Sequence, residues 1–174
     1  MVLFGFADGR YLAISVEIRK ERGEKFSPWK GLLRQYEIVY MVATEEDALM
    51  LRTNYRKDIV RLYPVKVSRE KMRAVLVSML KRANALREEP QFYNTLSNNC
   101  ATNIAHHARK FSEKDIPWWD YRYLMPAYFD EVAYNLGIID TTLSLEKARE
   151  HFNITQKAQK CPRVIFSKCI RDEL

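Results

Sequence analysis

The chain has 174 residues, of which 47% are hydrophobic and 29% are charged, and its formal net charge is +7. This length and composition are typical of one globular domain, and they exclude low-complexity and collagen-like chains. No apolar stretch approaches the length of a membrane span and no secretory leader precedes Asp8, so the sequence gives no cellular address of its own.

The excess of basic residues is spread along the chain, and most of these residues have acidic neighbours. This pattern favours a solvated surface of mixed charge, with proximity to an anionic membrane as the second interpretation. No nucleic-acid motif is present, so we expect no nucleic-acid partner.

A β-hairpin is predicted at the start of the chain, because the apolar runs 2–6 and 11–18 flank an Asp8-Gly9 turn signal. Alternation places two sets of side chains on opposite faces of the second strand. Glu17 is most simply a solvated strand residue, but it becomes a candidate site residue if its face lines a cleft. The apolar face carries Leu12, Ile14, Val16 and Ile18, and the other carries Ala13, Ser15, Glu17 and Arg19.

A loop, two strands and two helices are predicted next. Residues 20–31 are charged and rich in turn formers, which predicts a loop. Apolar runs predict strands over 32–43 and 58–67. Thr44 and Ser68 are expected to cap helices, and the second of these helices has apolar residues at helical spacing as far as Glu89.

The segment 93–111 carries the residue best suited to chemistry. Ser97, Asn98 and Asn99 favour a helix cap, which places Cys100 in the first helical turn. Unpaired backbone N–H groups and the helix dipole lower the pKa of a thiol there, and the same amides can receive an oxyanion. The alternative is that Cys100 is a small buried apolar residue.

The nearby histidines do not fit as partners of this thiol. His107 lies about 10 Å further along the helix axis than Cys100, and His106 points about 120° away. A base must therefore come from elsewhere in the protein, and His151 is the one histidine that helix geometry does not exclude.

Helices are predicted over 126–136 and 144–152, and an aromatic cluster lies before and within the first of them. Such a cluster usually packs in the core or in a loop, but an acyl-chain site or a membrane-facing lip uses the same residues. Its members are Trp118, Trp119, Tyr121, Tyr123, Tyr128 and Phe129.

The last residues contain Cys161 and Cys169, which can form a disulfide only in an oxidising compartment. Two thiols without a nearby histidine pair make no zinc site, so we expect no metal and assign these cysteines no role. We expect one catalytic-type α+β domain over 1–160 and a C-terminal tail over 161–174.

Ordered blocks along nearly the whole chain resemble a bacterial domain family that includes the Lnb-type lipoprotein N-acyltransferases. The resemblance rests on several blocks rather than on one short pattern. They are residues 8–19, 31–37, 51–53, 62–64, 92–103, 116–118 and 137–140.

This resemblance implies an antiparallel sheet packed against helices in a circularly permuted papain-like (NlpC/P60-like) arrangement, with an Asn-Cys element similar to that of lecithin:retinol acyltransferase-like enzymes. Cys100 then takes an acyl group from a lipid ester and passes it through a thioester to an amine, which is N-acylation of a bacterial lipoprotein. The implied partners are a phospholipid or a diacylglyceryl lipoprotein at a membrane surface. The implied location is the outer face of the inner membrane or the periplasm, and no cofactor is expected.

One departure concerns the base. The family's histidine belongs just before the strand of Phe4, whereas here no histidine precedes His106. We expect a chain that begins inside a longer protein, and the alternatives are another base or an inactive member. A non-catalytic lipid- or protein-binding domain and a cysteine hydrolase or peptidase remain as other functions.

The candidate site residues fall into two groups. The arginines among them could hold a lipid head group, although ion pairs with Glu17, Glu37 or Asp58 are the more common use of such residues. The candidates for catalysis are Cys100, Asn99 and Glu17, and those for substrate binding are Tyr93, Asn94, Arg19, Arg34, Trp118 and Trp119.

Overall fold

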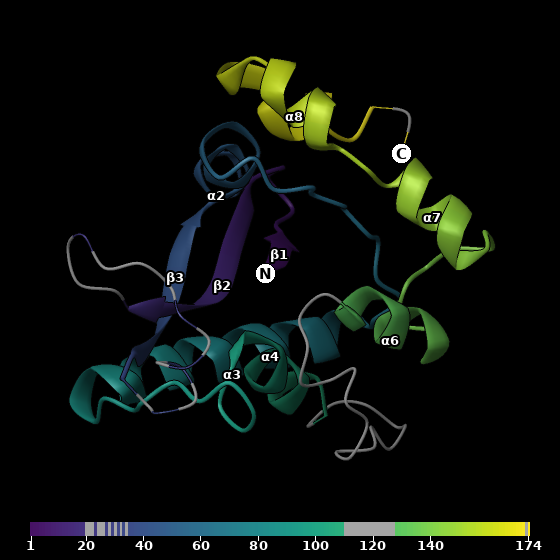
Figure 1. Ribbon diagram of the computed structural model, residues 1–174. Coiled ribbons are helices and arrows are strands. Elements are labelled where there is room, and N and C mark those ends of the chain that lie inside the picture. Colours follow the sequence, from purple (N-terminus) through teal and green to yellow (C-terminus); the bar gives the residue numbers. More distant parts are fainter. Residues whose placement is uncertain are drawn as a thin grey trace. The chain divides into compact units, whose positions relative to one another are not determined.

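The computed structural model describes residues 1–19, 23, 27, 29, 31, 33, 35–109, 128–172 and 174. The chain is α+β, as the sequence predicts, with an antiparallel sheet of order β1-β2-β3 (Figure 1). The strands are β1 (Val2–Gly5), β2 (Tyr11–Arg19) and β3 (Glu37–Thr44).

The predicted hairpin between β1 and β2 is confirmed. Gly9 adopts a φ of 81°, a conformation that glycine reaches without a steric cost. The Phe6 N–H donates to the Arg10 carbonyl at 2.9 Å, which closes the turn. Gly5 is also required by packing, because a Cβ atom there would lie 2.8 Å from the ring of Tyr11.

The two faces predicted for β2 are both buried at the centre of the strand. Ala13, Ile14, Ser15 and Val16 are all buried, although they alternate between the two faces. The centre of β2 is therefore covered on both faces.

The strand predicted over 32–43 begins later than expected. The N–H groups of Gly31 and Leu33 donate to carbonyls four residues earlier, at Ser27 and Trp29, so a helical turn lies where the strand was predicted to start. The strand itself starts at Glu37. Apolar residues on a helical turn and on a strand cannot be told apart by hydrophobicity over so short a run.

The two predicted helix caps are confirmed, and Ser144 caps the helix predicted over 144–152 in the same way. In each, the cap hydroxyl accepts a hydrogen bond from the backbone N–H three residues later, which satisfies one of the unpaired donors of the first turn. The helices, with their caps, are α2 (Glu45–Met50) after Thr44, α3 (Arg69–Glu88) after Ser68 and α7 (Leu145–His151) after Ser144.

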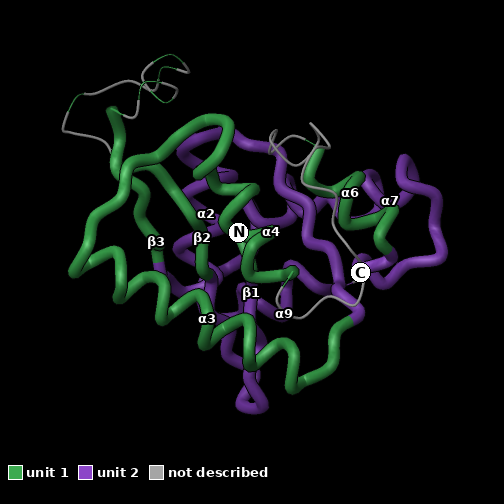
Figure 2. The backbone as a smooth tube through the Cα atoms, turned by 90° about the horizontal axis from the view of Figure 1, so that it is seen from below, with its two compact units in different colours: residues 1–2, 14–41, 67–136 green, residues 3–13, 42–66, 137–174 purple. Residues whose placement is uncertain are grey.

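Two compact units divide the chain, and Figure 2 colours them separately. Unit 1 comprises residues 1–2, 14–41 and 67–136, and unit 2 comprises residues 3–13, 42–66 and 137–174.

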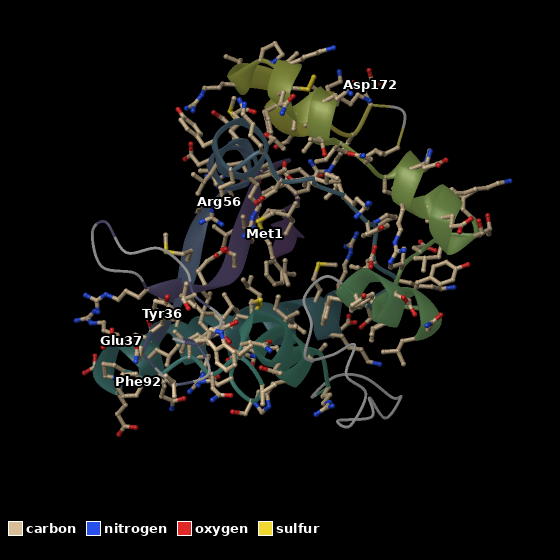
Figure 3. The ribbon with its side chains drawn as sticks, viewed as in Figure 1. Met1, Tyr36, Glu37, Arg56, Phe92 and Asp172 are labelled. Atoms are coloured by element: carbon tan, nitrogen blue, oxygen red, sulfur yellow. A yellow bond between two sulfur atoms is a disulfide. The ribbon has the colours of Figure 1, made fainter. Side chains whose placement is uncertain are left out.

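In unit 1, helix α4 (Cys100–Arg109) packs against α3 and α6 (Phe129–Asn135). The segment that leads into α4 pairs with the start of β3, where the Tyr93 N–H donates to the Tyr36 carbonyl at 2.7 Å. Figure 3 labels Tyr36, Glu37 and Phe92 at this junction. The entry to α4 is thus held by backbone hydrogen bonds to the sheet.

Unit 2 has its own core, built around Leu49 and Ile154. The strand predicted over 58–67 is wrong, since this segment makes only isolated bridges, one to Asn153 and one to Ile139. The remaining elements of unit 2 are η1 (Leu51–Tyr55), α8 (Thr155–Lys160), η3 (Arg163–Ile165) and α9 (Phe166–Cys169).

The segment 161–174, for which the sequence predicts a tail, belongs to unit 2. Phe166 and Ile170 are among its most buried side chains, and Cys161 forms a disulfide with Cys169. Across the described part of the chain, we find no helix with the length and apolar character that crossing a bilayer requires.

Candidate functional site around Cys100

The loop before α4 is folded by the side chain of Asn94. Its Oδ1 atom accepts hydrogen bonds from the N–H of Leu96 at 2.9 Å and of Ser97 at 3.0 Å. The backbones of Asn94 and Asn98 also exchange hydrogen bonds of 3.1 and 3.0 Å. Asn94, a predicted substrate-binding residue, therefore has a clear task in shaping this loop.

Asn99 caps α4, as the sequence predicts, and is 1% exposed. Its Oδ1 accepts from the Thr102 N–H at 2.9 Å, and its own N–H donates to Thr102 Oγ1 at 2.9 Å. Its amide Nδ2 donates to the Thr95 carbonyl at 2.7 Å. This reciprocal arrangement fixes the turn that ends at Cys100, the first residue of α4.

Cys100 is a free, half-buried thiol. Burial raises its pKa above the ordinary value for cysteine, and the negative charge of Glu17 acts in the same direction. The amino group of Met1 and the N–H groups of Ala101 and Cys100 act in the opposite direction but do not prevail. The expected lowering of this pKa by the helix terminus is thus wrong in sign, because desolvation outweighs the amides.

Glu17 lies on β2, close enough for its charge to act on the thiol of Cys100. Two of the three residues that the sequence suggests for catalysis, Glu17 and Cys100, therefore lie in unit 1 within range of each other's charge. A carboxylate beside a half-buried sulfur favours the neutral thiol, and it attracts any cation that approaches the sulfur.

Tyr93 also lies beside the thiol. Burial raises its pKa to about 12, and the charge of Cys100 adds to the effect. A Cβ atom on Gly31 would lie 3.2 Å from the ring of Tyr93 and 2.7 Å from Thr95 Oγ1, so only glycine fits against this loop without a shift.

His107 is buried and hydrogen-bonded, far along α4 from the thiol. Its Nε2 lies 2.8 Å from the hydroxyl of Tyr40, and its Nδ1 lies 2.9 Å from the hydroxyl of Ser78. His151 lies in unit 2 with its ring against Phe152. The contacts of His107 with Tyr40 and Ser78 confirm the prediction from helix geometry that His107 is not a partner of Cys100.

No described contact joins the remaining predicted site residues to the thiol of Cys100. Arg19 is exposed and forms an ion pair with Glu37 at 2.9 Å. Such an ion pair is the more common use of an arginine of this kind. Arg34, Trp118 and Trp119 lie outside the described residues. Among those that are described, no group of three or more His, Cys, Asp or Glu side chains could hold a metal ion.

Sequence reasoning missed the polar residues that lie behind the cap. Asn103 and His107 are 8% and 2% exposed, and they occupy positions i and i+4 of α4. The sequence signal for such residues is a pair of polar side chains at helical spacing on the face of the helix that also carries apolar residues.

Searches of curated proteins and of solved structures found no match. A family model described as the Lnb N-terminal periplasmic domain matches residues 1–127. This match includes β1 to β3, the cap at Asn99 and all of α4. The chain therefore belongs to the Lnb N-terminal periplasmic domain family.

Proposed function

We propose that this domain is a cysteine-dependent acyltransferase that N-acylates bacterial lipoproteins through a thioester on Cys100. The observation that carries the proposal is the free, half-buried thiol on the first residue of a firmly capped helix. Membership of a periplasmic family supports a position in the bacterial envelope, where both diacylglyceryl lipoproteins and phospholipids occur. A hairpin and a third strand that precede a cysteine helix suit the circularly permuted papain-like order.

The proposed reaction has two steps. In the first, the thiol loses its proton to a base, the sulfur bonds to the ester carbonyl carbon, and the carbon–oxygen bond breaks to release a protonated alcohol. In the second, the acceptor's ammonium group gives one proton to water, the nitrogen of the resulting amine bonds to the same carbon, the carbon–sulfur bond breaks, and the amine's second proton passes to the base or to the sulfur. A thioester suits the second step because an amine attacks it readily.

The first turn of α4 is suited to hold the oxyanion of both steps. The cap uses the N–H groups of Thr102 and Asn103, which donate to the side chain and carbonyl of Asn99. The N–H groups of Ala101 and Cys100 are the ones that act on the sulfur. Donors fixed in this way stabilise negative charge that develops beside the sulfur.

The raised pKa of Cys100 means that the resting thiol is protonated, so the mechanism requires a base rather than a standing thiolate. A carboxylate alone is a weak base for a thiol. We therefore assign Glu17 the role of binding the acceptor, because its negative charge attracts an ammonium group. We assign Tyr93 the role of packing beside the reacting carbon.

One observation favours a second function. The raised pKa of Cys100 is also what a non-catalytic scaffold shows, in which the cysteine is a half-buried structural residue that lies near a lipid or protein ligand. A hydrolase or peptidase differs from the acyltransferase only in the acceptor, which is water.

The decisive experiment is incubation of the protein with a phospholipid that carries a fluorescent acyl chain. We expect an acyl adduct on the wild type that neutral hydroxylamine removes, because hydroxylamine cleaves thioesters, and no adduct on Cys100→Ala. A Cys161→Ala/Cys169→Ala variant is the matched control, since it removes the sulfur atoms of the other two cysteines and should keep the adduct. An adduct of equal yield on Cys100→Ala would remove this thiol from the mechanism.

The acceptor step distinguishes the remaining functions. Addition of a diacylglyceryl peptide with a free α-amino group should discharge the adduct and leave the peptide N-acylated. Discharge to free fatty acid alone would indicate a hydrolase, and a wild type that binds the phospholipid without any adduct would indicate the non-catalytic domain.

Glu17→Gln is expected to have opposite effects on the two properties of the site. Removing the negative charge lowers the pKa of Cys100, so alkylation by iodoacetamide at pH 8 should be faster. Transfer from the thioester to the amine should be slower, because the ammonium loses its carboxylate. Glu37→Gln makes the same change on the exposed partner of Arg19 and should leave both rates unchanged. Equal alkylation rates in wild type and Glu17→Gln would contradict the effect of Glu17 on the thiol, and equal transfer rates would contradict its assignment to the acceptor.

A further inference from the structure

A connected group of buried polar side chains lies behind the cap of α4 in unit 1. Tyr40 on β3 and Asn103 and His107 on α4 are 7%, 8% and 2% exposed. Ser78 on α3 joins them through His107. Burying so many polar groups is costly unless each is paired, and the described residues contain no buried side-chain nitrogen or oxygen without a partner.

The directions of the hydrogen bonds in this group follow from its geometry. Asn103 Nδ2 lies 2.9 Å from the carbonyl of Asn99, which can only accept, so this atom is the amide nitrogen and donates. The oxygen of the same amide therefore faces the hydroxyl of Tyr40, at 3.1 Å, and accepts its proton.

The assignment continues to the imidazole. The single proton of the Tyr40 hydroxyl is used on Asn103, so at 2.8 Å the Nε2 atom of His107 must be the donor to the tyrosine oxygen. In neutral His107 the Nδ1 atom then accepts from the hydroxyl of Ser78 at 2.9 Å. The chain of donors runs from Ser78 through His107 and Tyr40 to Asn103.

This chain ends on the turn that carries the thiol. Besides the Asn99 carbonyl, Asn103 Nδ2 donates to Asn98 Oδ1 at 2.8 Å. Asn98 in turn donates from its own amide to the Phe92 carbonyl at 2.8 Å. One side chain, Asn103, thus holds the two residues that immediately precede Cys100.

We propose that Tyr40 and His107 are positioning residues for Cys100, which act through Asn103 on the Asn98-Asn99 turn. The inference rests on the proposed function, since it assigns these residues to the geometry of the same thiol. Neither residue is assigned a contact with substrate. They hold the Asn103 amide in place, because the Tyr40 hydroxyl, which receives a hydrogen bond from His107, gives its proton to the amide oxygen.

The test is Tyr40→Phe, which removes one hydroxyl and keeps the ring. We expect the turn to loosen and the thiol to become less buried, so the midpoint of the iodoacetamide rate against pH should move down toward that of an exposed cysteine. Alkylation at pH 8 should rise about fivefold, the factor that corresponds to one hydrogen bond. Formation of the acyl adduct should fall by a similar factor, because the sulfur is no longer held against the amides of α4.

Two further variants and a control separate positioning from simple loss of stability. His107→Gln keeps an amide donor within reach of the tyrosine oxygen and should restore most of the wild-type profile, whereas His107→Leu should behave like Tyr40→Phe. Tyr55→Phe makes the same chemical change on an exposed tyrosine of unit 2 and should leave the alkylation profile unchanged. All rates are measured at a temperature at which far-UV circular dichroism shows each variant folded.

The inference and the proposed function can fail separately. A changed alkylation profile in Tyr40→Phe supports positioning even if no acyl adduct forms on the wild type. An unchanged profile, with only a lower melting temperature, would show that the group is structural and would overturn the inference, even if the wild type is acylated.

Discussion

Arg171→Ala should lower the free energy of unfolding of unit 2 by about 3–5 kcal/mol, because it leaves the buried carboxylate of Glu45 without its partner. The Glu45 side chain is 1% exposed, and both of its oxygens accept from the guanidinium, from Nη1 at 2.8 Å and from Nη2. These residues are 126 positions apart in the sequence, so the pair fastens the last turn of the chain to the first turn of α2.

The arginine is held by more than the carboxylate. Its guanidinium carbon lies 3.6 Å from the centroid of the Tyr11 ring, and Nη1 also donates to the Ser167 carbonyl at 2.9 Å. A cation over an aromatic face contributes about 0.5–2 kcal/mol, less than the cost of an unpaired buried charge. The ion pair with Glu45 is therefore expected to account for more of the effect of Arg171→Ala than the contact with Tyr11.

The measurement is urea unfolding at pH 7 followed by two probes. Trp29 lies within the residue ranges of unit 1, so in a background with Trp118→Phe and Trp119→Phe the tryptophan fluorescence reports that unit, whereas circular dichroism reports both units. We expect Arg171→Ala to lower the urea midpoint of the circular dichroism transition and to change the midpoint of the fluorescence transition little.

Arg163→Ala is the matched control for Arg171→Ala. Arg163 also pairs with α2, with Glu46 at 3.0 Å, but its side chain is 67% exposed. An exposed pair contributes about 0–1 kcal/mol, so this variant should unfold close to the wild type. The double variant Glu45→Leu/Arg171→Leu should be more stable than Arg171→Ala, because it removes the unpaired charge as well. If Arg171→Ala and Arg163→Ala lowered the free energy of unfolding by the same small amount, burial of Glu45 would not explain the effect of Arg171→Ala.

The helices that the sequence predicts correctly are those specified by neighbours in the chain. Thr44, Ser68 and Ser144 each bond to a backbone N–H three residues later, and that interaction needs no distant partner. The same reasoning places Cys100 at the start of α4 and Asn99 at its cap. Local signals therefore sufficed for the backbone of the site.

Features that depend on distant contacts were not predictable in the same way. Residues 58–67 have the composition of a strand, yet Arg61 and Val65 pair only in isolated bridges with residues far along the chain. The pKa of Cys100 was predicted in the wrong direction because burial and the charge of Glu17 are tertiary properties. Spacing alone could not show that Asn103 and His107 face Tyr40.

The second large effect concerns the disulfide between Cys161 and Cys169, which are eight positions apart. Cys161→Ala/Cys169→Ala is expected to lower the free energy of unfolding of unit 2 by about 2–3 kcal/mol, since a cross-link over a short loop restricts the unfolded chain by about that amount. Cys161 also packs in the core with Phe166 and Ile170, so reduction loosens the segment that carries Arg171. Disulfides persist in oxidising compartments, and the family is periplasmic.

The same urea unfolding, with and without tris(2-carboxyethyl)phosphine, checks this expectation. The reductant should lower the circular dichroism midpoint of the wild type to about that of the double variant, and it should have no effect on the double variant itself. Tryptophan fluorescence should again change little, because the disulfide lies in unit 2. A wild type that is insensitive to reductant would mean that Glu45, Arg171 and the buried side chains hold the end of the chain without the cross-link. In that case the stability of unit 2 would not depend on an oxidising compartment.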